Sequence, residues 1–361
     1  MERMDALMLP LNWQRVRLGD IANYLTSNLS AEQITQQGKI KVYDVNNFIG
    51  YTDTTFISDK PYISIVKDGS VGRVRILPPK TNILSTMGAL IANHRTTTEF
   101  LFYLLSNFDF KNFTSGSIIP HIYFKDYKEK TIFLPPLNEQ SAIANILSDV
   151  DHYLYSLDAL ILKKEGVKKA LSFELLSQRK RLKGFNQTWQ RVRLGDIANY
   201  LTSNLSAEQI TQQGKIKVYD VNNFIGYTDT TFISDKPYIS IVKDGSVGRV
   251  RILPPKTNIL STMGALIANH RTTTEFLFYL LSNFDFKNFT SGSIIPHIYF
   301  KDYKEKTIFL PPLNEQSAIA NILSALDNEI ISLKNKKRQF ENIKKALNHD
   351  LMSAKIRVLE K

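Results

Sequence analysis

Two stretches of the chain, residues 138–180 and 313–361, carry apolar residues at heptad spacing. The rows of the first stretch are made of Ile143, Val150, Leu157, Leu147, Leu154, Ile161, Leu171 and Leu175. The rows of the second stretch are made of Ile319, Leu326, Leu333, Phe340, Leu347, Leu323, Ile330 and Leu351. This period predicts two long helices of the coiled-coil type, with Asn138 as the N-cap of the first. At a rise of 1.5 Å per residue the first helix is about 60 Å long, and Gly166 allows a bend in it.

The region before each long helix has a different pattern. Short runs rich in β-branched and aromatic residues lie between Gly, Pro and Asn, which is typical of strands. The expected strands are residues 38–45, 61–66, 72–77, 88–94 and 130–135. Residues 96–108 combine threonine caps, Glu99 in the first turn and apolar residues at helical spacing, which predicts a helix. Each region is therefore expected to be an α+β domain.

This domain and the start of its helix occur twice. Residues 13–148 are identical to residues 189–324 at all 136 positions, with a constant offset of 176. Beyond residue 148 the copies diverge, but the same residue type recurs at that offset for Asp151, Ser156, Leu157, Glu165, Lys168, Lys169, Ala170, Leu171 and Leu175. A recent duplication, a gene conversion and an engineered sequence all explain such identity. We call residues 1–136 the first head, 137–181 the central spacer helix, 182–312 the second head and 313–361 the distal spacer helix.

The connections between these parts constrain the two helices. Only residues 181–188 link the central helix to the repeated part of the second head, and the distal helix leaves that head directly. If the two ends of a head lie close together, as domain termini often do, the distal helix starts where the central helix ends. The helices then run antiparallel, and an approximate two-fold axis relates the heads. The predicted fold class is α+β, with two heads separated by a pair of long antiparallel coiled-coil helices.

Composition narrows the class of protein. A length of 361 residues suits two ordinary domains, and 43% hydrophobic and 22% charged residues are normal for a folded protein. The absence of cysteine excludes a disulfide framework, a thiolate metal cluster and a cysteine nucleophile. We expect a cytoplasmic protein without membrane contact, because no signal peptide and no apolar run of spanning length is present. The net charge of +12 favours a polyanionic partner, although residues 13–148 hold only 14 basic against 11 acidic side chains.

Two identical heads related by a two-fold axis match the symmetry of an inverted repeat in double-stranded DNA, whose half-sites lie about 34 Å apart per helical turn. Four polar loops in each head offer contacts: residues 43–53, 66–75, 93–98 and 113–128 of the first head and their repeats. Glycines there allow the backbone to approach phosphate, Arg and Lys bind phosphates or guanine, and Asn binds adenine. The candidate DNA-binding residues are Tyr43, Asn46, Asn47, Lys67, Ser70, Arg73, Arg75, Asn93, His94, Arg95, Ser115, Ser117, His121, Tyr123, Lys125, Tyr219, Asn222, Asn223, Lys243, Ser246, Arg249, Arg251, Asn269, His270, Arg271, Ser291, Ser293, His297, Tyr299 and Lys301.

Simpler structural interpretations stay open for these candidates. The KDGS segment is commonly a plain turn between strands, and His121 also suits a half-buried histidine with a satisfied hydrogen bond. Tyr123 and Phe124 also suit core positions. The basic runs at residues 163–169 and 334–338 suit solvated helix faces as well as contacts to a partner or to phosphate.

Enzymatic motifs are absent from the sequence. The segment LPPL at residues 134–137 lacks the flanking residues with which amino-methyltransferases hold a flipped adenine. G-x-x-x-x-G-K-[ST], G-x-G-x-x-G after a strand, H-E-x-x-H and G-x-S-x-G do not occur. We therefore expect a recognition protein with no catalytic residue, no metal site and no cofactor of its own.

Several segments together resemble one known family. They are W-x4-LGDI at residues 13–21 and 189–197, KDGSVG, TSGSIIPHI, LPPLNEQSAIANILS at the start of each long helix, and RLKGF before the second head. In this order they resemble the specificity subunit of type I restriction-modification systems. The resemblance covers essentially the whole chain, and P-P-L-x-E-Q-x-x-I-A is its most specific motif.

The resemblance implies a non-catalytic subunit in which each head is a target-recognition domain for one half of a bipartite DNA sequence. The helix pair would set the length of the unrecognised gap. The implied partners are two methylation subunits, which use S-adenosylmethionine to methylate adenine N6, and ATP-driven restriction subunits with translocase and nuclease activity. Helix positions expected to be apolar, exposed and available for these partners are Ile146, Tyr153, Leu160 and Ile322.

The chain departs from the family pattern because its two heads are identical, whereas the recognition domains of a specificity subunit usually differ. Identical heads on a two-fold axis predict a palindromic target with a fixed gap. One alternative is a stand-alone repressor of palindromic operators. Another is a scaffold whose heads bind two copies of a protein ligand. The bases recognised, the gap length and the presence of restriction subunits are left open by the sequence.

Overall fold

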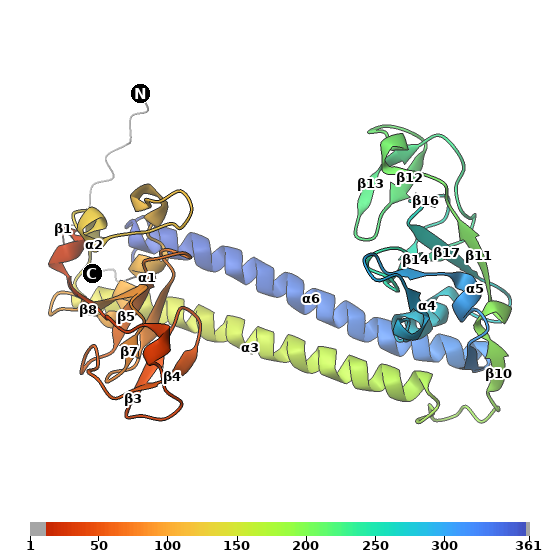
Figure 1. Ribbon diagram of the computed structural model, residues 1–361, viewed down its shortest axis with the longest axis horizontal. Helices are drawn as coiled ribbons and strands as arrows, with labels where there is room; N and C mark the ends of the chain where they lie inside the picture. Colours follow the sequence, from red (N-terminus) through yellow and green to blue (C-terminus); the bar gives the residue numbers. More distant parts are fainter. Residues whose placement is uncertain (1–11, 359–361) are drawn as a thin grey trace. The chain divides into compact units, whose positions relative to one another are not determined.

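The computed structural model describes residues 12–358, which form two compact units. Unit 1 combines Met1–Asp158 with Asn335–Lys361, and unit 2 is Ala159–Lys334. Each unit contains one head, the start of the long helix that leaves this head, and the end of the other long helix (Figure 1). A unit is therefore not simply a head and the helix that follows it. The start of one long helix and the end of the other pack on the same head.

The first head is built from short strands and two helices. Its strands are β1 (Gln14–Arg17), β2 (Ala22–Thr26), β3 (Ile40–Tyr43), β4 (Phe48–Thr52), β5 (Tyr62–Val66), β6 (Val74–Leu77), β7 (Asn82–Ile83), β8 (Met87–Ala92) and β9 (Thr131–Leu134). Its helices are α1 (Thr98–Ser106) and α2 (Phe124–Tyr127). All five expected strands and the expected helix are present, and Thr97 caps α1 by accepting a hydrogen bond from the Phe100 backbone N–H.

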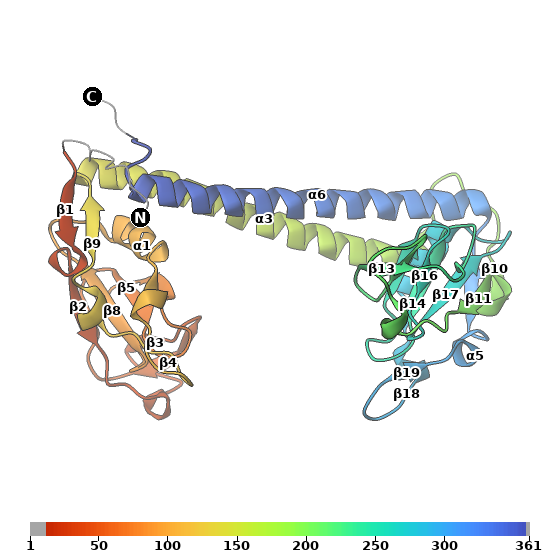
Figure 2. The same cartoon turned by 90° about the horizontal axis from the view of Figure 1, so that it is seen from above.

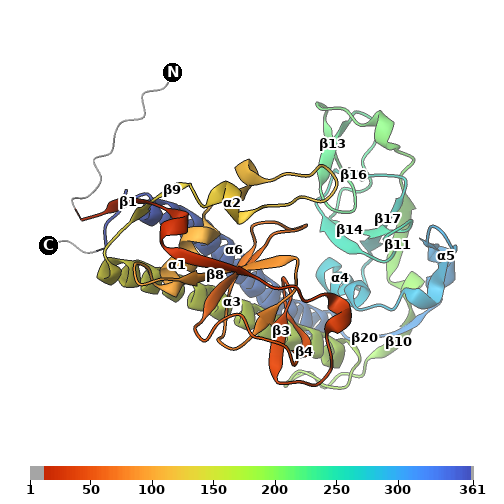
Figure 3. The same cartoon turned by 60° about the vertical axis from the view of Figure 1, so that its left-hand side comes forward.

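The strands of the first head form three sheets. The largest has the order β2-β8-β5-β6 and is antiparallel throughout. A second sheet has the order β4-β3-β7, in which β3 pairs with β4 antiparallel and with β7 parallel. β1 pairs with β9, with Gln14 opposite Leu134, and so joins the first and last strands of the head where the chain continues into the long helix (Figure 3). This pairing brings the two ends of the head together.

The core of the first head lies between its largest sheet and α1. Fully buried members of this core are Ile63, Ile65, Leu90, Phe100 and Leu101. The same cluster includes the ends of both long helices, represented by Ile143, Leu147, Leu351 and Met352. Figure 2 shows α1 between the sheet and the two long helices in unit 1. The helix ends are therefore part of the hydrophobic core of the head.

The two long helices are α3 (Leu137–Leu176) and α6 (Leu313–Met352). In unit 1, Asp151 of α3 pairs with Lys344 of α6, and Asp158 pairs with Lys337 at 2.8 Å. The residue number rises along one helix as it falls along the other, so the helices are antiparallel, as predicted. In unit 2 the same order holds for the ion pairs Lys164–Glu329 and Lys168–Asp327.

The second head repeats the first. Its strands are β10 (Gln190–Arg193), β11 (Ala198–Thr202), β12 (Ile216–Tyr219), β13 (Phe224–Thr228), β14 (Tyr238–Val242), β15 (Val250–Leu253), β16 (Asn258–Ile259), β17 (Met263–Ala268), β18 (Thr290–Ser291), β19 (His297–Ile298) and β20 (Thr307–Leu310). Its helices are α4 (Thr274–Ser282) and α5 (Phe300–Tyr303). The sheet orders β11-β17-β14-β15 and β13-β12-β16 match those of the first head.

Three details differ from the expectations. The stretch 43–53, expected as a loop, contains β4, because its aromatic and β-branched residues pair with β3. α3 begins at Leu137, so Asn138 lies inside the first turn and is not the N-cap. α3 continues through Gly166 without a break and ends at Leu176, just before Gln178 with φ +62°. Among residues 12–358, no helix has the length and apolar content that crossing a membrane requires.

Candidate nucleic-acid interface

Three polar segments of the first head are joined by hydrogen bonds. They are the turn between β3 and β4, the loop between β5 and β6, and the segment 115–125 that leads into α2. Arg73 connects the β5–β6 loop to the β3–β4 turn through its bond to Asn46. At the other end of this loop, the Lys67 carbonyl accepts a hydrogen bond from the Ile122 N–H at 2.9 Å. The β5–β6 loop therefore links the other two segments into one polar surface.

The first part of this surface is an arginine cluster, made of Tyr43, Asn46, Arg73 and Arg75. Arg73 donates to Asn46 Oδ1 at 2.8 Å, and Arg75 Nη1 donates to the Asn46 carbonyl at 2.8 Å. The guanidinium of Arg75 also lies over the Tyr43 ring, 5.4 Å from its centroid. These contacts use only part of the five donors of each guanidinium, so both arginines are held in place with donors left for a ligand.

The turn that carries Asn46 and Asn47 is fixed by an aspartate that the sequence analysis did not select. Asp44 Oδ1 accepts hydrogen bonds from the backbone N–H of Asn46 at 2.8 Å and of Asn47 at 2.7 Å. This is the aspartate turn for which the D-x-N spacing is a recognisable signal. Both asparagine side chains are exposed, so Asp44 positions the turn and leaves Asn47 free to contact a ligand.

The second part of the surface is a histidine loop, residues 115–125 together with Lys67, Asp68 and Ser70. His121 Nδ1 lies 2.7 Å from Asp68 Oδ1, and its ring stacks near that of Tyr123. Lys125 places its ammonium 5.5 Å from the centroid of the Tyr123 ring. His121 is half-buried and hydrogen-bonded, whereas Tyr123 is 48% exposed and Phe124 stacks on Tyr24. Phe124 is therefore part of the packing, while Tyr123 and Lys125 face solvent.

The candidates Asn93, His94 and Arg95 lie elsewhere, at the junction between the head and α3. Asn93 donates to the Asp20 carbonyl at 2.9 Å and accepts from the Arg95 N–H, so its amide is used within the fold. Arg95 donates to Gln14, and its carbonyl accepts from Gln140 of α3. The structure therefore does not bring this group together with the arginine cluster and the histidine loop.

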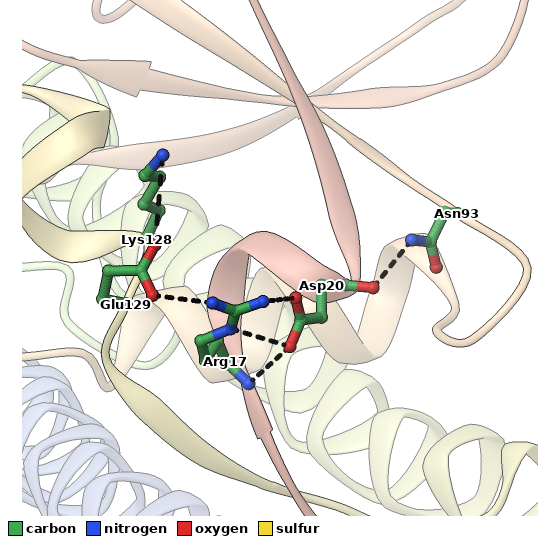
Figure 4. Close-up of polar contacts among 5 residues, drawn as sticks. All are labelled: Arg17, Asp20, Asn93, Lys128 and Glu129. Atoms are coloured by element: carbon green, nitrogen blue, oxygen red, sulfur yellow. Dashed lines mark hydrogen bonds and ion pairs between the residues drawn. The ribbon is translucent and has the colours of Figure 1, made fainter.

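An ion-pair network lies at the LGDI turn after β1, next to Asn93 (Figure 4). Arg17 contacts Asp20 at 2.9 Å and Glu129 at 3.0 Å, and Lys128 also approaches Glu129. The hydrogen bond from Arg17 lowers the pKa of Asp20 below its usual value. Each of these four side chains contacts another member of the network, so the network holds the LGDI turn in place.

The second head repeats these placements. Arg249 and Arg251 bond to Asn222, with Arg251 over the ring of Tyr219, and His297 lies 2.7 Å from Asp244. The repeated candidates on the polar surface of the second head are Tyr219, Asn222, Asn223, Lys243, Ser246, Arg249, Arg251, Ser291, Ser293, His297, Tyr299 and Lys301. The repeated junction group is Asn269, His270 and Arg271, with Asn269 bonded to the Asp196 carbonyl. Each unit thus presents the same polar surface.

The structure places the four candidate partner-binding residues of the helices in different surroundings. Leu160 is exposed. Ile146 and Ile322 are partly buried against the cores of the first and second heads, because the start of each long helix packs on its head. Tyr153 packs on Phe340 of the opposite helix with ring centroids 4.6 Å apart. Heptad spacing locates the seam between helices but not the side that contacts a head.

A buried glutamate anchors each long helix to its head. Glu139 is 1% exposed and accepts a hydrogen bond from Trp13 Nε1 at 3.1 Å. Its repeat Glu315 is 0% exposed and accepts from Trp189 Nε1 at 2.9 Å. Beside Glu139, Gln140 bonds to the backbone of Arg95 and Pro135. The E-Q pair in LPPLNEQSAIANILS is therefore a structural junction.

No group of three or more His, Asp or Glu side chains that could hold a metal ion occurs in the part of the chain that the structure describes. Heads that expose arginine, lysine and asparagine on loops, joined to long antiparallel helices, define a class of multidomain DNA-recognition proteins. The chain belongs to the family of type I restriction modification DNA specificity domains, whose family model matches residues 10–164 and 186–342. Both heads and most of both helices lie inside these matches.

Relatives over the full length agree with this family. The chain is 25% identical over 408 residues to the type I restriction enzyme MjaVIII specificity subunit of Methanocaldococcus jannaschii, covering 99% of this chain and 96% of that protein. It is 27% identical to the putative type I restriction enzyme MjaX specificity subunit of the same organism, covering 97% and 95%. Its fold matches the crystal structure of the S subunit of a type I restriction-modification system from M. genitalium, with a TM-score of 0.66, 23% identity and coverage of 96% and 97%.

Proposed function

We propose that this specificity subunit recognises a palindromic bipartite DNA sequence, with one head on each half-site and the helix pair setting the gap. The observation that carries the proposal is the identity of the two heads over all 136 repeated positions. Identical surfaces related by a two-fold axis bind identical half-sites on opposite strands. The four-part division into head, central helix, head and distal helix belongs to the same proposal.

One contact between a head and the long helices occurs in both units. Asp151 of α3 accepts a hydrogen bond from Tyr103 of the first head at 2.9 Å and pairs with Lys344 of α6. In unit 2, Asp327 of α6 accepts from Tyr279 at 2.9 Å and pairs with Lys168 of α3. The same contact is therefore made within each unit, with the parts played by α3 and α6 exchanged.

On DNA, we assign base contacts to the arginine cluster and backbone contacts to the histidine loop. Arg73 and Arg75 are held by Asn46, so little side-chain entropy is lost when a guanidinium binds a guanine edge with two hydrogen bonds. Lys67, Lys125 and the loop serines suit phosphate oxygens. For Asn93 and Arg95 we favour a supporting role, because their amide, guanidinium and carbonyl groups bond to Asp20, Gln14 and Gln140. His94 is exposed between them and stays a candidate contact.

The partners belong to the same proposal. Each unit offers one equivalent head–helix junction, which suits two methylation subunits that use S-adenosylmethionine to methylate adenine N6. Restriction subunits driven by ATP complete the assembly, which we place in the cytoplasm. Leu160, exposed on α3, remains a candidate contact for a partner, whereas Ile146, Tyr153 and Ile322 stabilise the subunit itself.

Selection from a random duplex library by the assembled complex tests the proposal. The expected product is a half-site, a fixed gap and the reverse complement of that half-site. A variant that lacks one heptad from each long helix is the matched control: its gap should change while the half-site bases stay the same. Replacing Arg73 and Arg75 by Lys in the first head alone should relax the base preference in one half-site only. An unrelated sequence in the two half-sites would contradict the proposal.

A further inference from the structure

Each head exposes an isoleucine pair at the tip of the histidine loop. Ile118 is 92% exposed and Ile119 is 55% exposed. The repeats Ile294 and Ile295 have the same exposures. Ile118 and Ile294 are the most exposed large apolar side chains of residues 12–358. In Figure 2 the loop between β18 and β19, which carries the pair of the second head, projects away from α6. The isoleucine side chain is therefore surrounded by water, although its burial would lower the free energy.

The backbone holds this tip in a defined shape. Ser115 and His121 exchange two backbone hydrogen bonds, of 2.9 Å and 2.7 Å, at the base of the loop. Gly116 has φ +88°, and a Cβ at this position would clash with the Ile119 carbonyl oxygen. The Pro120 carbonyl accepts a hydrogen bond from the Gly69 N–H at 2.9 Å. The tip is therefore anchored on both sides and presents Ile118 outward.

The surroundings of the tip indicate what covers it. Lys67, Lys125 and the hydroxyl groups of Ser70 and Ser117 lie in the same loops, and Tyr123 is half-exposed beside Lys125. An apolar tip with cations and hydroxyls around it complements a ligand with anions outside and apolar faces inside, which describes a nucleic-acid duplex. A protein partner would need about 800 Å² of contact surface for a stable interface, more than two isoleucine side chains offer.

We propose that Ile118 and Ile294 are wedges that enter one base step in each half-site and partly unstack it. Insertion of an apolar side chain between bases kinks a duplex, and pyrimidine–purine steps accept this deformation most easily. The chain then selects a deformable step in addition to the bases that its arginines contact. This inference rests on the proposed DNA recognition and adds a residue that determines specificity through DNA shape.

The test uses the assembled complex and its selected target duplex, with 2-aminopurine placed at successive positions of each half-site. We expect the fluorescence to rise at one step in each half-site on binding. The substitutions Ile118→Ser and Ile294→Ser together should abolish this rise and weaken target binding about tenfold or more. Ile118→Leu with Ile294→Leu is the matched control and should keep both properties. Because the palindromic duplex can be bound in either orientation, Ile118→Ser alone should halve the rise in each half-site.

The possible outcomes separate the wedge from the proposed function. If the serine variants bind the target with unchanged affinity and unchanged fluorescence, the wedge is wrong while DNA recognition stands. If the serine variants lose affinity but show the same fluorescence as the original complex, the tip contacts DNA without unstacking it. The wedge is then again wrong. If the variants fail to assemble with the other subunits, the tip is a protein contact. If the original complex selects no sequence at all, the proposed function itself fails.

Discussion

The two ends of the helix pair have the same contact positions but different side-chain chemistry. In unit 2, Lys164 of α3 pairs with Glu329 of α6 at 2.8 Å. The equivalent positions in unit 1 hold Phe340 and Tyr153, whose rings pack with centroids 4.6 Å apart. An ion pair and an aromatic pair therefore occupy the same place. The register of the helices is kept where the sequence has diverged.

The arginine beside each buried glutamate shows a second difference. Arg181 approaches Glu315 with two nitrogens, at 2.7 Å and 3.3 Å. Its equivalent Arg357 lies 3.7 Å from Glu139, whose Oε1 has no hydrogen-bond partner among the described residues. Arg181 lies in the connection between α3 and the second head, whereas Arg357 follows the end of α6. Arg357 also donates to Asn12, near the start of the described chain.

This comparison shows which part of the molecule is constrained. The buried glutamates, the tryptophans and the head residues that face the helices are identical in the two units. The diverged parts of the helices keep the spacing of their contacts, but an ion pair in one unit is replaced by apolar packing in the other. Packing position is therefore under stronger constraint than the chemistry of a half-exposed pair, which agrees with the small contribution of such pairs to stability.

The largest expected effect comes from removing the arginine at each junction. Arg181→Ala leaves the carboxylate of Glu315 buried without its cation and should lower the free energy of unfolding of unit 2 by about 3–5 kcal/mol. Arg357→Ala removes a longer contact from a side chain that is 37% exposed and should cost unit 1 about 1 kcal/mol. Urea denaturation followed by tryptophan fluorescence measures both.

The chain contains two tryptophans, one at each junction, so each unit has its own reporter. A Trp13→Phe background isolates the signal of Trp189, and the Trp189→Phe background isolates that of Trp13. Arg181→Lys is the matched control and should recover part of the loss, because it restores charge without the two-nitrogen contact. Equal losses for Arg181→Ala and Arg357→Ala would show that the two junctions are energetically equivalent, contrary to this account.

A smaller effect is expected from exchanging the helix contacts. Lys164→Phe with Glu329→Tyr gives unit 2 the aromatic pair of unit 1. The free energy of unfolding should change by about 1 kcal/mol or less, because a half-exposed ion pair contributes little. Salt should destabilise the variant less than the original protein, since one screened pair has been removed. Unfolding at low and high salt measures this, and an unchanged salt dependence would argue against an ion pair at this position.

The smallest expected effect concerns the identical heads. Arg17 lowers the pKa of Asp20, mainly through a side-chain hydrogen bond, and Arg193 does the same for Asp196. A carboxylate whose pKa is lowered by folding adds stability above its unfolded pKa, and this stability is lost as the pH falls through its folded pKa. Both carboxylates are about one-third exposed and their arginine partners are more exposed, so the effect on stability is small. Carbon NMR titration should give equal pKa values for the two aspartates, and Arg17→Ala should raise only the pKa of Asp20.

Local patterns predicted the elements of the fold well. β-branched runs located β3, β5, β6, β8 and β9, and the heptads located both long helices. β1 and its pairing with β9 were not predicted, because partners 120 positions apart leave no local signal. Asn138 was expected as the N-cap, but α3 already begins at Leu137, directly after the proline pair.

The candidate site was predicted in part. Loop composition located the arginine cluster and the histidine loop in each head, since Arg, Asn and Gly in loops follow from simple chemistry. Sequence alone did not separate them from Asn93 to Arg95, whose bonds to Asp20 and Gln140 exist only in the folded chain. Ile118 was passed over, because the exposure of an isoleucine depends on what packs beside it.

The most direct test of the central claim is sequencing of methylated adenines in the DNA of cells that express this subunit with its methylation and restriction partners. The account predicts one motif in which the second half-site is the reverse complement of the first, methylated once in each half at symmetric positions. Substitution of the four residues of the arginine cluster in the first head, with the second head left unchanged, should convert this motif into one with two different halves. A motif with two unrelated half-sites in the original protein would contradict the account, because identical heads would then be recognising different sequences.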